Sequence, residues 1–159
     1  MNEADRIKKA YEKRDSLGKP EIYSAFDPAT LFIIQQRERE VLRALKKFGA
    51  ADLSGKKIAD LGCGKGKELN RMVFFGALPE NLSGIDLLPD RIESAKNLFP
   101  NIDFRCGNAE SLPYENDSFD IILCFTVFSS IMDTAMKRSV AAEMMRVLKR
   151  GGIVLWYDF

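Results

Sequence analysis

Apolar and polar residues follow two different rhythms along this chain. Five short apolar runs, each bounded by polar residues, glycine or proline, predict strands at about 57–61, 82–86, 102–105, 119–125 and 153–158. Between the strands, apolar residues recur every three or four positions and predict helices at about 66–75, 89–98 and 133–148. Strands that alternate with helices in this way are typical of a parallel sheet with right-handed crossovers.

The first 50 residues carry no strand pattern and predict two helices instead. Residues 2–14 combine mixed charges with apolar positions at helical spacing, and residues 16–25 are expected to form a loop. The second helix should begin at Asp27, whose carboxylate caps it, with Pro28 in its first turn, and should end before Gly49. Its expected apolar stripe is Leu31, Ile34, Val41, Leu42 and Leu45.

Composition limits the domain organisation and the partners. A chain of 159 residues that is 46% hydrophobic has the size of one domain, and we expect a helical cap at 1–50 on a core at 55–159. The net charge of +1 gives no reason to expect a nucleic-acid partner. No apolar run approaches the ~20 residues of a membrane span. The three cysteines lack metal-site spacing, so we expect no metal, and without a signal peptide we expect a cytoplasmic location.

The most informative segment is Asp60-Leu61-Gly62-Cys63-Gly64-Lys65-Gly66, which follows the first predicted strand and precedes a helix. A glycine turn at such a junction is the usual form of a nucleotide-binding site, because glycine lets the main chain approach a ligand and the helix start offers unpaired N–H groups. A dinucleotide fingerprint requires a glycine three positions after Gly64, where this chain has Lys67. The turn therefore disfavours NAD as the ligand.

Asp60 narrows the ligand class further. A carboxylate repels a pyrophosphate and attracts an ammonium group, so this turn favours an amino acid joined to a nucleoside over a dinucleotide. Two alternatives stay open. The turn could be structural and bind no ligand, and Asp60 could serve only as a cap for the helix that follows.

Five segments, in order, resemble the motifs of the class I S-adenosylmethionine-dependent methyltransferases, and the closest likeness is to the small-molecule group. They are the turn at 60–66, Gly84-Ile85-Asp86-Leu87, Cys106-Gly107-Asn108-Ala109-Glu110-Ser111-Leu112-Pro113-Tyr114, Asp117-Ser118-Phe119-Asp120-Ile121-Ile122 and Val147-Leu148-Lys149-Arg150-Gly151-Gly152. The resemblance implies an α/β fold, a Rossmann-like three-layer sandwich with a mainly parallel sheet in the order 3-2-1-4-5 and an N-terminal helical extension. It also implies S-adenosyl-L-methionine as cofactor and S-adenosyl-L-homocysteine as product.

The resemblance assigns roles to individual residues of this chain. The implied cofactor contacts are Asp60, Gly62, Cys63, Gly64 and Gly66 at the amino-acid end, Asp86 at the ribose, Leu87, Asn108 and Ala109 at the adenine, and Phe125 beside the methyl group. Each has a simpler alternative: Asp86 could cap the next helix, Asn108 could be a turn residue, and Phe125 could be ordinary core. Cys63 is expected to be a small tolerated residue, not a nucleophile.

The implied reaction is methyl transfer to an unidentified small-molecule acceptor by in-line displacement at the sulfonium. Alignment and desolvation can supply much of the catalysis of such a reaction. The chain has no histidine, the commonest general base, and no catalytic residue can be named. The alternatives are a cofactor-binding domain without turnover and, less favoured, an NAD-dependent oxidoreductase.

The sequence stops directly after the fifth predicted strand, where the family usually adds two more strands. We therefore expect a truncated or shortened form. The outer edge of residues 153–158 would carry unpaired backbone groups in an apolar, aromatic run. Such an edge pairs readily with another chain, so we expect a homo-oligomer through these residues, or a neighbouring element that covers them.

Overall fold

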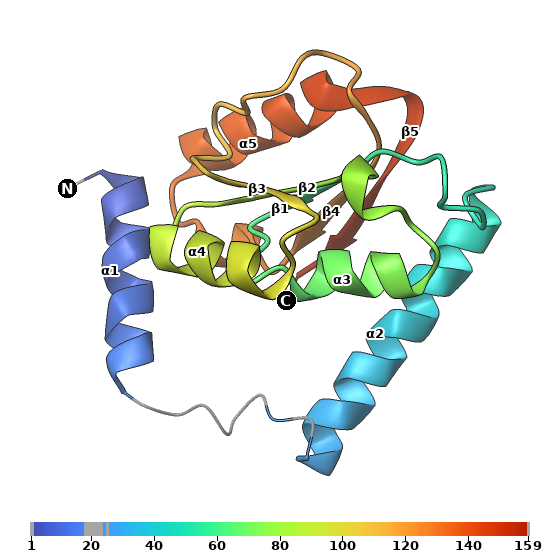
Figure 1. Cartoon of the computed structure of the whole chain (residues 1–159). Helices are drawn as coiled ribbons and strands as arrows, with labels where there is room; N and C mark the ends of the chain where they lie inside the picture. The colour runs from blue at the N-terminus through green and yellow to red at the C-terminus, as the bar shows by residue number, and fades with distance from the viewer. Residues whose placement is uncertain (1, 18–23, 25, 159) are drawn as a thin grey trace.

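A five-stranded parallel sheet, in the order β3-β2-β1-β4-β5, lies between two layers of helices (Figure 1). The computed structural model describes residues 2–17, 24 and 26–158, so the loop predicted at 16–25 lies largely outside the described residues. The strands are β1 (Ile58–Leu61), β2 (Leu82–Asp86), β3 (Asp103–Cys106), β4 (Phe119–Phe125) and β5 (Leu148–Tyr157). The helices are α1 (Glu3–Ser16), α2 (Pro28–Lys47), α3 (Lys67–Phe74), α4 (Pro89–Leu98) and α5 (Thr134–Val147), with short 3-10 turns at Pro79–Asn81 and Phe128–Ser130.

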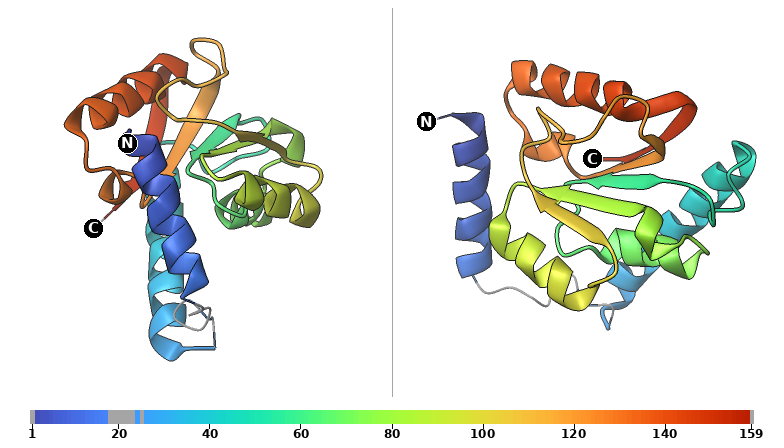
Figure 2. Two further views of the ribbon diagram at one scale, coloured as in Figure 1. Left: turned by 90° about the vertical axis from the view of Figure 1, so that its left-hand side faces the viewer. Right: turned by 45° about the horizontal axis from the view of Figure 1, so that its top comes forward.

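Different helices bury the two faces of the sheet (Figure 2). One apolar cluster joins the sheet to α2, α3 and α4 and includes Leu45, Met72 and Ile92. The other cluster joins the sheet to α5 and α1, and Val140 and Ile7 belong to it. Consecutive residues of β4, from Ile121 to Phe125, fall alternately into the two clusters, as the pleat of a strand requires. The predicted Rossmann-like sandwich and its strand order are confirmed.

Two helix starts follow from capping carboxylates. The Asp27 side chain accepts the N–H of Thr30 at 2.8 Å, and Pro28 occupies the first turn of α2, as predicted. The Asp133 side chain accepts the N–H of Ala135 at 2.6 Å at the start of α5. An N-terminal carboxylate satisfies backbone donors that have no partner within the helix.

Only part of the apolar stripe predicted for α2 is buried. Val41 and Leu45 are 8% and 2% exposed, whereas Leu31 and Leu42 are 39% and 45% exposed. The prediction is wrong for Leu31 because the first turns of α2 extend past the sheet (Figure 1). It is wrong for Leu42 because that residue lies beside the buried face of the helix and not on it.

Strand β5 begins at Leu148, whereas the sequence predicts a start at 153. Leu148 pairs with Phe119, and the pairing resumes with Ile153 opposite Ile121, so residues 149–152 bulge out of register. The prediction that Gly151 and Gly152 separate the helix from the strand is therefore wrong. Both glycines lie within the irregular first part of β5.

Strand β5 is an edge of the sheet within the part of the chain that the structure describes, because it pairs with β4 alone. Trp156 is 65% exposed on this edge, whereas Leu155 is 8% exposed and packs into the core. Pairing of residues 153–158 with a second copy stays a prediction.

Candidate functional site

A cavity opens at the carboxyl end of the strands, where the strand order reverses between β1 and β4, the usual ligand position in open α/β sheets. It encloses about 840 Å³, its open mouth included. Six of the predicted contacts line it: Gly62, Asp86, Leu87, Asn108, Ala109 and Phe125. The other four predicted residues, Asp60, Cys63, Gly64 and Gly66, lie outside its wall.

The glycine turn takes backbone conformations that other residues avoid. Gly62 and Gly64 have φ values of +71° and +53°, in the left-handed region that favours glycine. A Cβ on Gly62 would lie 2.7 Å from Cγ2 of Val127, so no side chain fits there. Around Gly64, no atom of the described residues other than its two chain neighbours lies within 4 Å of the position that a Cβ would take. The main chain at Gly64 is therefore open to close approach by a ligand.

Asp86 ends β2 and joins the glycine turn to the start of α4. Its Oδ2 accepts the N–H of Gly64 at 2.8 Å, and its Oδ1 accepts the N–H of Leu88 at 2.9 Å. Leu88 is the N-cap residue of α4, and no side chain caps this helix among the described residues, so the second bond fixes the chain just before α4 without being a helix cap. A carboxylate offers about four acceptor positions, and two backbone bonds leave Asp86 further acceptor capacity beside the cavity.

The loop after β3 returns to the end of β2. The N–H of Gly107 donates to the backbone carbonyl of Asp86 at 2.9 Å. Asn108 makes a turn with Glu110: its Oδ1 accepts the Glu110 N–H at 3.0 Å, and its Nδ2 donates to the Glu110 carboxylate at 2.8 Å. The turn role is thus present, and the Oδ1 atom keeps a second lone pair for another donor.

Asp60 is the most unusual polar residue near the site. It is 2% exposed, and its Oδ2 is buried with no hydrogen-bond partner among the described residues. Burial raises the pKa of this carboxyl well above its ordinary value, and the negative charges of Glu68 and Asp86 raise it further, against the opposing effect of Arg37. An unpartnered buried carboxylate is unfavourable unless a positive group comes to it.

Phe125 separates the cavity from a second, apolar groove between α2 and β5. It is 8% exposed, belongs to the core cluster and lines both spaces. The Arg37 guanidinium lies 5.5 Å from its ring centre and 5.6 Å from that of Tyr157, and Arg37 also forms an ion pair with Glu68. Phe125 is therefore both a core residue and part of the cavity wall.

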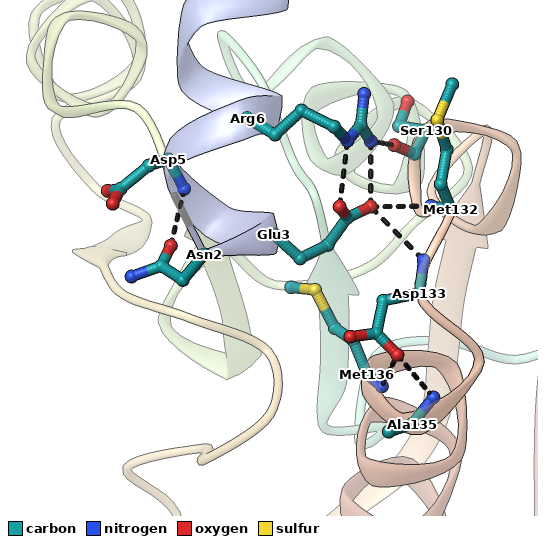
Figure 3. Close-up of polar contacts among 9 residues, drawn as sticks. All are labelled: Asn2, Glu3, Asp5, Arg6, Ser130, Met132, Asp133, Ala135 and Met136. Carbon is teal, nitrogen blue, oxygen red and sulfur yellow. Dashed lines mark hydrogen bonds and ion pairs between the residues drawn. The ribbon is translucent and has the colours of Figure 1, made fainter.

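Helix α1 covers the cavity, and polar contacts tie it to the loop after β4 (Figure 3). The Glu3 carboxylate accepts two hydrogen bonds from Arg6 at 2.8 Å and one from the N–H of Met132 at 2.6 Å. Arg6 also donates to the carbonyl of Ser130 at 2.6 Å. We call Glu3, Arg6 and these backbone groups the α1 latch. The bonds from Arg6, then that from Met132, lower the Glu3 pKa to about 2, so the latch keeps its charges down to strongly acid pH.

The structure adds cavity residues to those predicted as cofactor contacts. Tyr11 lines the cavity, and its hydroxyl lies 2.8 Å from Oγ of Ser130. The guanidinium groups of Arg14 and Arg91 lie on the same ring, each 4.4 Å from its centre. Tyr11 stands four residues after buried Ile7, a spacing that indicated one face of α1. Arg91 carried no such signal, because it looks like an ordinary polar position of α4.

Two of the three cysteines, Cys63 and Cys124, are buried. Burial raises the pKa of the Cys63 thiol, and it raises that of Cys124 to about 12, so neither is a ready nucleophile. Within the described residues there is no cluster of three or more side chains suited to holding a metal ion. The same part of the chain contains no helix with the length and apolar character needed to cross a membrane.

Comparisons with known proteins agree with this geometry. A family model described as a methyltransferase domain matches residues 59–156. A phthiotriol/phenolphthiotriol dimycocerosates methyltransferase of Mycobacterium ulcerans is 33% identical over 118 residues, which cover 67% of this chain and 39% of that protein. A ubiquinone/menaquinone biosynthesis C-methyltransferase of Campylobacter jejuni is 30% identical over 127 residues, which cover 77% of this chain and 52% of that protein.

Solved structures with the same fold are also similar. The YcgJ protein of Bacillus subtilis is 27% identical, with a TM-score of 0.65 over 78% of this chain and 50% of that one. A phosphoethanolamine N-methyltransferase of Haemonchus contortus, at 18% identity, matches in fold with a TM-score of 0.76 over 99% of this chain and 33% of that one. This chain spans 39% and 52% of the length of the two curated relatives described above.

Proposed function

Since this chain belongs to the class I S-adenosylmethionine-dependent methyltransferase family, we propose that it binds S-adenosyl-L-methionine in the cavity and transfers the methyl group to a small molecule. The observation that carries the proposal is Oδ2 of Asp60, buried with no partner among the described residues, two positions before cavity-lining Gly62. The ammonium group of the cofactor, directly or through a water molecule, supplies the positive charge that Asp60 lacks.

The other predicted residues contact different parts of the cofactor. Asp86 accepts from the ribose hydroxyls with the acceptor capacity that its two backbone bonds leave free. Asn108 and Ala109 meet the adenine edge, and Leu87 packs on the adenine face. Phe125, in the wall between the cavity and the apolar groove, lies beside the methyl group.

The cofactor, when bound, supplies an electrophilic methyl group on its sulfonium. The residues of this chain contribute alignment and the exclusion of water, because α1 covers the cavity and the wall around Phe125 is apolar. One curated relative is named as a phthiotriol/phenolphthiotriol dimycocerosates methyltransferase and the other as a C-methyltransferase of ubiquinone/menaquinone biosynthesis, and both names support a small-molecule acceptor. A cofactor-binding domain without turnover is the alternative.

Calorimetry with S-adenosyl-L-methionine, S-adenosyl-L-homocysteine and NAD tests this proposal. We expect micromolar dissociation constants for the two sulfur compounds, about −8 kcal/mol, and no heat with NAD. Heat with NAD and none with either sulfur compound would overturn it. Tight cofactor binding without methyl transfer to any of a panel of small acceptors would favour the alternative.

Opening the α1 latch is expected to speed the release of the product from the cavity. Arg6→Gln removes the charged fork that holds Glu3 and the Ser130 carbonyl, so α1 should leave the cavity more often. We expect the dissociation rate of S-adenosyl-L-homocysteine, measured by surface plasmon resonance, to rise by about threefold to tenfold. Lys9→Gln, at an exposed position of the same helix, is the control. Equal rates in both variants would mean that α1 does not gate the cavity.

A further inference from the structure

The loop between β3 and β4 depends on α5 for its conformation. This loop, residues 107–118, carries Asn108 and Ala109 on the cavity wall, and we call it the adenine loop. Its first residue is held by the sheet, since the N–H of Gly107 donates to the carbonyl of Asp86 at 2.9 Å. Residues 112–116 of the loop are held mainly by two charged side chains of α5, Glu143 and Arg146.

Arg146 gathers three separate acceptors of the adenine loop. Its guanidinium donates to the carbonyl of Leu112 at 3.0 Å, to the carbonyl of Tyr114 at 2.8 Å and to Oδ1 of Asn116 at 2.9 Å. A guanidinium carries five N–H donors in a rigid plane, so a single arginine can hold several carbonyl groups at once. Lysine could not reproduce this arrangement.

Glu143 completes the contact from one turn earlier on α5. Its carboxylate accepts the N–H of Leu112 at 2.7 Å and receives two bonds from Arg146, at 2.6 and 2.8 Å. Both backbone groups of Leu112 are therefore bound to this pair. The bonds from Arg146, then that from Leu112, lower the Glu143 pKa to about 2, so the pair is charged at every pH of interest.

The backbone of α5 extends the same attachment. The N–H of Asp117 donates to the carbonyl of Arg146 at 3.0 Å, and that of Ser118 to the carbonyl of Val147 at 2.8 Å. Neither Glu143 nor Arg146 lines the cavity, so neither touches a ligand there. Leu112 is 5% exposed and belongs to the apolar cluster against which cavity-lining Ala109 packs, so the position of Leu112 bears on the cavity wall.

We propose that Glu143 and Arg146 are positioning residues for the adenine subsite: from outside the cavity they hold the adenine loop so that Asn108 and Ala109 face the base. This inference rests on the proposed function. It assigns the discrimination between purine bases to two residues that never contact the ligand.

The test compares two ligands that differ at the base. S-adenosyl-L-homocysteine carries an amino group on the purine, where S-inosyl-L-homocysteine carries an oxygen, so an ordered adenine loop should prefer the first by about tenfold. Arg146→Gln is expected to weaken the adenine ligand by about tenfold and to reduce the preference to about twofold. Arg138→Gln, at an exposed position of the same helix, is the control. Amide hydrogen exchange of residues 108–118 should become faster in Arg146→Gln and stay at the wild-type rate in Arg138→Gln.

A purely structural role would give a different result. Arg146→Gln would then lower the melting temperature and weaken the binding of both ligands equally, with the preference for adenine unchanged. This outcome overturns the inference and leaves the proposed function standing. If Arg146→Gln does not fold, Glu143→Gln answers the same question, because its amide oxygen still accepts from Leu112 while the charge is lost. An unchanged preference in a folded Glu143→Gln overturns the inference, and a wild-type protein that binds neither ligand overturns the proposed function with it.

Discussion

Replacing Asp60 with asparagine is expected to stabilise the ligand-free protein and to weaken its binding of S-adenosyl-L-methionine at least about tenfold. The stability gain follows from the raised pKa of a buried carboxyl with an unpartnered oxygen. A group whose folded pKa is raised contributes stability that is present below its unfolded pKa and lost as the pH rises through the folded pKa. Asparagine does not ionise, so the Asp60→Asn variant loses no stability as the pH rises between these two pKa values. Its melting temperature should exceed that of the wild type at pH 8, by about 2–4 °C for each kcal/mol, and the difference should vanish near pH 4.

The affinity of the wild-type protein for S-adenosyl-L-methionine should depend on pH in the opposite direction to its stability. An ammonium group binds the ionised form of Asp60, so wild-type affinity should increase with pH up to the raised pKa, and protons should be released on binding. Calorimetry in buffers of different ionisation heat measures both effects, and Asp60→Asn should show neither. Glu93→Gln, an exposed carboxyl of α4, is the control. Wild-type affinity in Asp60→Asn at every pH, or a lower melting temperature at pH 8, would contradict this account.

Replacing Asp86 with alanine is expected to weaken cofactor binding by roughly 2–3 kcal/mol, because bonds from the ribose hydroxyls to a charged acceptor are lost. The same variant should lose about 1–3 kcal/mol of unfolding free energy, since the N–H groups of Gly64 and Leu88 lose their acceptor. Denaturant unfolding and calorimetry on one preparation measure the two losses separately.

Asp86→Asn separates the two roles of this side chain. Its amide oxygen can still accept from the N–H of Leu88. Its amide nitrogen cannot accept a hydrogen bond, either from the N–H of Gly64 or from a ribose hydroxyl. We expect it to recover part of the lost stability and little of the lost affinity. Asp90→Asn, at an exposed position in the first turn of α4, is the matched control. A wild-type dissociation constant for Asp86→Asn would mean that the residue has only a structural role, through its bonds to Gly64 and Leu88.

The fold could be predicted because each element carries a local signal. Strand β4 is buried on both faces and, from Ile121 to Phe125, is a continuous apolar run, and Asp27 with Pro28 marks the start of α2. The bulged start of β5 could not be predicted, because Leu148 lies next to the end of α5 and its pairing with Phe119 depends on a partner 29 residues away. The exposure of Leu31 depends on how far α2 extends past the sheet, which no local pattern encodes.

By itself, the sequence determined the strand order, through its resemblance, and the residues that line the carboxyl edge of the sheet, of which Gly62, Asp86, Asn108 and Phe125 meet in one cavity. Only the tertiary structure decided what surrounds them. Glu3 bonds to Met132 across 129 residues, and Arg146 bonds to Leu112 across 34. Polar residues at helix surfaces carry no periodic signal that names their partner, whereas buried apolar residues must repeat with the period of their element. The Asp60 oxygen that has no partner among the described residues is likewise a consequence of packing, because burial in the folded chain, and not residue type, raises the pKa of this carboxyl.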